Sequence, residues 1–143
     1  MNVSSILAAK GGDVITIEPT ATLAVAAALL TKKRIGALVI VGAGGRVAGI
    51  LSERDIVHAL AERGRQALDE PLSQAMTREV ATCEPDDEIT SLMERMTDGK
   101  FRHMPVVKGD KLAGIVSIGD IVKQRVDEME RESEAMRGYI QTA

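Results

Sequence analysis

The feature that most constrains this sequence is an internal repeat, because a repeated unit limits the chain to folds built from two similar parts. Residues 14–19 (VITIEP) recur as residues 80–85 (VATCEP), 66 positions later. Residues 47–57 match residues 112–122 at seven of eleven positions, with an offset of 65. A change of one in the offset is expected where a surface turn between two strands tolerates an insertion.

Each copy has the local patterns of a small α/β unit. Branched apolar runs at 34–41 and 100–107 predict buried strands. Pro19 and Pro85 mark the points where a first strand ends and a helix follows. Each copy therefore reads strand, helix, strand, turn, strand, helix. We predict an α/β (α+β) fold of two tandem β-α-β-β-α repeats.

The helix ends and the connection between the copies agree with this order. Thr20 or Thr22 is expected to cap the first helix and Asp86 or Asp87 its counterpart, which Gly99 would end. The connection at 64–71 is short and polar, which favours close packing of the halves. We predict a repeat at 1–68 and a repeat at 69–143 that together form one compact module.

Composition excludes several classes of protein. The 143 residues are 45% hydrophobic, enough for one substantial core, and 1% aromatic, which leaves no stacking platform for single-stranded nucleic acid. The net charge of −3 does not favour nucleic acid or anionic membranes, and neither a signal peptide nor a membrane span is recognisable. Cys83 is the one cysteine, and with His58 and His103 it does not form a zinc motif. We expect a cytoplasmic protein.

Several of the repeated motifs point to one family. The segments at 49–55 (GILSERD) and 114–120 (GIVSIGD), with 102–107 (RHMPVV) and the two Glu-Pro steps, resemble the cystathionine-β-synthase (CBS) domain family. The resemblance implies a Bateman module, in which two repeats pack about a pseudo-two-fold axis with clefts between them. It also implies regulation by AMP, ADP, ATP or another adenosyl ligand such as NAD or S-adenosylmethionine, with no required cofactor and no catalysis.

The repeated Ser-x-x-Asp motifs are the first candidates for ligand contacts. Ser52 and Asp55, like Ser117 and Asp120, follow an apolar strand where a helix begins. A carboxylate there suits two ribose hydroxyls, and a helix start suits phosphate. The same motif is also a capping box, and the two roles can coexist. Arg54 is a phosphate candidate that the second copy lacks, so we expect unequal clefts.

Further candidates come from positions that the family uses to line the clefts. Thr16 and Thr82 recur at matched positions on the first strands, although threonine is common in strands for propensity alone. Residues at the start of the next strand would meet the base or the phosphates, and in the first copy they would leave room for a flat base without adding charge. These residues are Ile35, Gly36 and Ala37 in the first copy and Phe101, Arg102, His103 and Met104 in the second.

The C-terminal segment is expected to form a long helix from Asp120 to about Tyr139. Apolar residues in it follow a heptad-like spacing that Ser133 interrupts. This surplus helix could cover the chain's own sheet or pack on a second subunit, and with the resemblance it favours a homodimer. The output would then reach a downstream protein partner whose identity the sequence does not indicate.

Two other functional classes are alternatives to a ligand sensor: an assembly module and an enzyme. In a constitutive interaction or assembly module, the clefts would be unoccupied and the Ser-x-x-Asp motifs would only cap helices. An enzyme finds no support, because the sequence offers no nucleophile paired with a base and no metal cluster.

Overall fold

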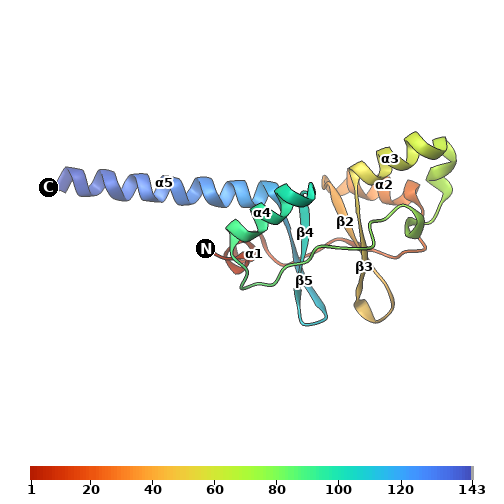
Figure 1. Cartoon of the computed structure of the whole chain (residues 1–143), viewed down its shortest axis with the longest axis horizontal. Helices are drawn as coiled ribbons and strands as arrows, with labels where there is room; N and C mark the ends of the chain where they lie inside the picture. Colours follow the sequence, from red (N-terminus) through yellow and green to blue (C-terminus); the bar gives the residue numbers. More distant parts are fainter. Residues whose placement is uncertain (143) are drawn as a thin grey trace.

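A computed structural model describes residues 1–142 and places the two copies side by side, each with a small sheet and flanking helices (Figure 1). The first half contains β1 (Thr16–Ile17), α2 (Leu23–Lys33), β2 (Ala37–Val41), β3 (Val47–Ser52) and α3 (Glu53–Arg63). The second contains α4 (Ile89–Gly99), β4 (His103–Lys108), β5 (Lys111–Ser117) and α5 (Ile118–Thr142). The predicted fold class is confirmed, including the long C-terminal helix.

The two sheets have the same plan, but the second has lost a strand. In the first half β1 pairs in parallel with β2, which pairs antiparallel with β3. In the second half β4 and β5 form the same hairpin, while the expected strand at 80–85 is reduced to one bridge, from Cys83 to Val106. Pro105 accounts for the loss. A parallel bridge at the position matching Thr16 would need the backbone N–H that Pro105 lacks.

Two short segments outside the repeated elements are exchanged between the halves. Helix α1 (Val3–Lys10) precedes the first half, yet Val3 and Ile6 are buried in the core of the second. The 3-10 turn η3 (Leu72–Gln74) leads into the second half, yet Leu72 is buried in the core of the first. Where sequence analysis expected one core, the structure has two, because each half buries the face of its own sheet.

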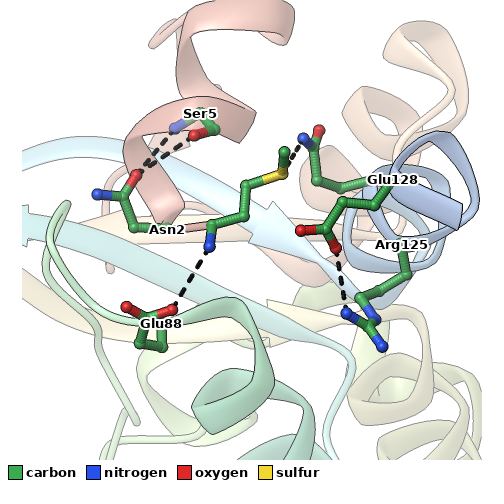
Figure 2. A network of polar contacts seen from close by, with 7 residues as sticks. Asn2, Ser5, Glu88, Arg125 and Glu128 are labelled. Atoms are coloured by element: carbon green, nitrogen blue, oxygen red, sulfur yellow. Dashed lines mark hydrogen bonds and ion pairs between the residues drawn. The ribbon is translucent and has the colours of Figure 1, made fainter. Parts of the chain in front are cut away.

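The N-terminus is fastened to the second half by polar contacts (Figure 2). The Asn2 side chain accepts a hydrogen bond from the Ser5 amide and caps α1. The Met1 amino group lies 3.6 Å from Glu88, and the Val3 amide donates to the carbonyl of Asp87 at 3.0 Å. The N-terminal segment, which lies within the predicted repeat at 1–68, therefore packs on the second half, while the predicted division at residue 68 stays a prediction.

Helices α2 and α4 end alike, with Arg34 and Lys100 both in the left-handed conformation, but they begin differently. Thr22 caps α2 as expected, but the expected cap of α4 by Asp86 or Asp87 is wrong: α4 begins after Glu88 without a side-chain cap, and the Asp87 carboxylate accepts from the Glu84 amide instead. Gly99 is the last helical residue of α4, and Lys100 takes the left-handed conformation that ends it. Gly99 is needed for another reason: a Cβ there would lie 2.3 Å from the ring of Phe101.

The first turn of α5 packs on the second core through Ile121, whereas the rest of the helix projects away from the body beyond α1 and α4 (Figure 1). Its length of 25 residues slightly exceeds the predicted one. Within the part of the chain that the structure describes, no helix is both long and apolar enough to cross a membrane.

Candidate functional site

The Ser-x-x-Asp motifs lie where a strand passes directly into a helix, and each forms a capping box. Asp55 accepts a hydrogen bond from the Ser52 amide at 2.8 Å, and the Ser52 hydroxyl accepts one from the Asp55 amide at 3.4 Å. Ser117 and Asp120 repeat this exchange at 2.9 and 3.1 Å. The capping interpretation is confirmed for both motifs, and each cap fixes its carboxylate at the start of a helix.

A cleft of about 450 Å³ opens between the halves beside Asp55. This volume is in the range of small-molecule sites. Both halves contribute to its wall, so the cleft exists only when they are packed together. It brings together seven of the candidate residues: Gly36, Ser52, Arg54, Asp55, Phe101, Arg102 and His103.

Part of the wall, which no motif of the sequence predicted, comes from the connection between the halves. Thr77 forms a bridge with Ile50 of β3, and its hydroxyl lies 3.5 Å from Oδ1 of Asp55. Nothing in the local sequence of this connection indicates that it crosses the cleft. The additional lining residues are Ile50, Glu53, Thr77, Glu79, Val80, Ala81, Gly99 and Lys100.

The remaining candidates lie outside the lining of this cleft. Ala37 and Met104 are buried, Met104 in the second core. Ile35 lines a neighbouring depression beside α2 and α3, which shares Gly36 and Glu53 with the cleft. Thr16 is exposed on β1, and the Thr82 carbonyl accepts a hydrogen bond from Arg95 at 2.8 Å. A role for these residues in ligand binding stays a prediction.

Asp120 differs from Asp55 because it has a cationic partner from α1. The Lys10 ammonium donates to Asp120 Oδ2 at 2.8 Å and to the Ile115 carbonyl at 3.0 Å. Burial disfavours the Asp120 carboxylate, but hydrogen bonds from Lys10 and the Ser117 amide outweigh it and lower the pKa of Asp120. We expect the two sites to differ because only the first copy has an arginine at the position of Arg54. The hydrogen bond from Lys10 to Asp120 adds a second difference.

The side chains of Arg54 and His103 each contact the opposite half of the chain. Arg54 Nη1 donates to the carbonyl of Lys100 at 3.3 Å. A Cβ on Gly36 would lie 3.3 Å from Cε1 of His103, so the imidazole fills the space that sequence analysis expected to be free for a base. Burial, helped by the charge of Arg102, lowers the pKa of His103 against the opposing effect of Glu53.

This lowered pKa predicts a pH-dependent stability. The unfolded chain binds the His103 proton with a pKa near 6.5, so between that value and the lower folded pKa it holds more protons than the native state. The stabilisation is complete above pH 6.5 and is lost as pH falls through the folded pKa. We expect the urea midpoint to decrease from pH 7 to pH 5, and to decrease less in His103→Gln.

The matched control is His58→Gln, since the His58 side chain is 72% exposed and pairs with Glu62 on the surface of α3. It should keep the pH dependence of the parent protein. If the urea midpoint of His103→Gln fell between pH 7 and pH 5 as much as that of the parent protein, His103 would not be the group whose protonation destabilises the fold.

The other candidate groups for chemistry are placed outside the cleft. Cys83 is buried, and desolvation together with the nearby charge of Asp87 raises its pKa to about 12, so the thiolate is strongly disfavoured. Among residues 1–142, no three His, Cys, Asp or Glu side chains are arranged to hold a metal ion.

The chain is a tandem-repeat module. It consists of two α/β repeats with a cleft between them, and the segments α1 and η3 each pack on the half that does not follow them directly. The family model for the CBS domain matches residues 3–62 and again 72–127. The chain belongs to the CBS domain family and contains a tandem pair of these domains. The resemblance inferred from the motifs is confirmed.

Solved structures of similar proteins agree with the assignment. The CBS-domain containing protein ATU1752 from Agrobacterium tumefaciens is 45% identical, with a TM-score of 0.85 over 87% of this chain and 92% of that one. The CBS domain pair of protein MJ0100, in complex with 5′-methylthioadenosine and S-adenosyl-L-methionine, is 28% identical, with a TM-score of 0.80 over 90% and 98%. CBS domain protein PAE2072 from Pyrobaculum aerophilum, complexed with AMP, is 30% identical, with a TM-score of 0.75 over 84% and 89%.

Proposed function

We propose that this CBS pair is a regulatory module that binds an adenine nucleotide or a related adenosyl ligand in the cleft beside Asp55. The observation that carries the proposal is the composition of that cleft, where a ribose-type carboxylate of one half faces Arg102 and His103 of the other. The complexes of MJ0100 and PAE2072 with adenosyl compounds support the same ligand class. Because both halves line the cleft, a bound ligand would favour one relative packing of the halves over others.

The contacts of Asp55 leave it able to receive a ribose. Its Oδ2 atom accepts from the Ser52 amide, whereas Oδ1 has a contact of 3.5 Å with Thr77, at the limit of a hydrogen bond. Oδ1 can therefore accept from a ribose hydroxyl without loss of the helix cap. Capping and ligand binding are compatible at this residue.

The rest of the wall provides separate polar and apolar partners. Arg54, Lys100 and Arg102 contribute cationic side chains suited to phosphate oxygens. Phe101 and Val80 contribute apolar surface against which a base can lie. Glu53, Asp55 and Glu79 balance the cations and would oppose a highly charged polyphosphate, which favours ligands of low charge such as AMP or S-adenosylmethionine.

We further propose that one ligand binds per chain. At Asp120 the Lys10 ammonium, 2.8 Å away, takes the carboxylate that a second ribose would need. A second ligand would have to displace this ion pair, and only 34% of the Lys10 side chain and 25% of the Asp120 side chain are exposed. The first site has no such competitor among the contacts of Asp55 described above.

The test is calorimetric titration of the protein, shown to be folded and free of bound ligand, with AMP, ADP, ATP, NAD and S-adenosylmethionine. Saturable binding of at least one compound, with one site per chain, is the expected result. Inorganic phosphate and adenosine, titrated separately, show which part of the ligand supplies the affinity. The absence of binding by all five compounds would overturn the proposal.

That negative result would favour the second candidate, a constitutive assembly module. The two complete capping boxes support it, because they account for both Ser-x-x-Asp motifs without a ligand. In either function the module would act without catalysis, through a downstream protein partner. A cytoplasmic location also stays a prediction.

A further inference from the structure

Helix α5 carries an apolar stripe, interrupted once by Ser133, that the rest of the described chain leaves exposed. The large apolar residues of the stripe are between 46% and 69% exposed, and beyond its first turn the helix extends away from both halves (Figure 1). The spacing alternates between four and three residues, which is the a and d pattern of a heptad repeat. The stripe consists of Val122, Val126, Met129, Met136 and Ile140, and Ser133 occupies the remaining a position, between Met129 and Met136.

The charges beside the stripe are complementary to those of a second copy. With Val126 at an a position, Arg125 and Glu132 occupy g positions, and Glu130 and Arg137 occupy e positions. In a parallel pair, each g residue meets the e residue five positions later on the partner helix. Arg125 then meets the partner's Glu130, and Glu132 meets the partner's Arg137. Both contacts join opposite charges.

Arg125 can make this contact without losing its present one. Its Nη1 donates to Glu128 Oε2 of the same helix at 3.1 Å, as Figure 2 shows. A guanidinium has five N–H donors, so others remain for Glu130 across the seam.

Ser133 distinguishes between the two possible directions of pairing. In a parallel, in-register pair, Ser133 faces the partner's Ser133, and the two hydroxyls can hydrogen-bond to each other. In an antiparallel pair, a positions face d positions, so each hydroxyl would lie opposite an apolar side chain, Val122, Met129 or Met136. A buried hydroxyl without a partner is costly, and the antiparallel arrangement would contain two of them.

We propose that α5 pairs with α5 of a second copy as a parallel, in-register, two-stranded coiled coil. The apolar stripe would form the seam, and the flanking charges would set the register. The pairing is independent of what the cleft binds, because the stripe and the cleft share no residue. It would hold the two modules at the same end of the dimer, where a change in one can reach the other.

The first test is the molar mass of the full chain by light scattering and sedimentation equilibrium. The parent protein should be a dimer at micromolar concentration. Met129→Glu, which places a charge in the seam, should weaken the dimer by at least about 100-fold. Ala135→Glu adds the same charge on the exposed side of α5 outside the seam and should leave the dimer intact. Circular dichroism shows whether each variant keeps its helical content.

A monomeric parent protein would overturn the proposal, and so would a dimer that Met129→Glu leaves unchanged. Direction is tested with Ser133→Cys, which should form an intermolecular disulfide under mild oxidation only if equivalent positions meet. Cys83 should not compete, since it is buried. A dimer of Ser133→Cys that does not cross-link would refute the parallel arrangement. Calorimetric binding of a nucleotide is unaffected by any of these outcomes, so failure here is distinguishable from failure of the proposed function.

Discussion

Replacement of Leu72 by alanine is expected to lower the free energy of unfolding by about 3–4 kcal/mol. Leu72 lies in the connection after the first half, yet its side chain is fully buried among the residues of the first core. Its amide also donates to the Ala21 carbonyl at 2.8 Å, which holds the connection against the start of α2. Shortening the side chain would leave a cavity that this hydrogen-bonded segment cannot readily close.

The measurement is urea denaturation followed by circular dichroism. Leu60→Ala is the matched control, because Leu60 lies on α3 with 36% of its side chain exposed, and the same substitution there should cost less than about 1 kcal/mol. Equal losses in the two variants would contradict the inference that the connection is part of the first core.

Replacement of Asp55 by alanine should reduce the affinity for the adenosyl ligand by at least about 100-fold. Hydrogen bonds to a charged group contribute roughly 1.5–3 kcal/mol each, and two ribose hydroxyls donating to the carboxylate would together exceed that factor. The cap of α3 would be lost as well, at a cost of about 1 kcal/mol in stability. Calorimetry must therefore be performed where the variant is fully folded.

Asp120→Ala is the control that separates the two effects. It removes the capping box of α5 and the ion pair with Lys10, but it does not change the lining of the cleft beside Asp55. Affinity and stoichiometry should remain those of the parent protein. If the two variants bind equally well, or if only Asp120→Ala loses binding, the ligand does not use Asp55.

Much of the fold was predictable because it depends on local pattern. The offset of 66 residues corresponds to the observed strand register, where Ile17 pairs with Ile40 and Cys83 pairs with Val106 at equivalent positions. Thr22 at the start of α2 and the direct passage from strand to helix at Ser52 and Ser117 also follow from residue type and spacing. Pro105 shows the limit of the repeat, since one missing N–H removed a strand that the matched segment predicted.

The candidate site was predictable only in part. Ser52, Asp55, Arg102 and His103 share the cleft, as the combination of repeat and resemblance suggested. Thr77 and the residues after it were missed, because a polar connection has no local signal for what it crosses. The binding roles of all these residues stay predictions until a ligand is titrated.

The sequence by itself determined that the chain is a tandem pair of one α/β unit, with a capping Asp in each copy and a surplus C-terminal helix, because repeats, caps and periodicity are local properties. Only the tertiary structure decided that α1 covers the second core and the connection after the first half covers the first. It also decided that Lys10 holds Asp120 while Asp55 faces an open cleft. These features depend on contacts between segments as much as 110 residues apart, whose pairing follows from the packing of the whole chain.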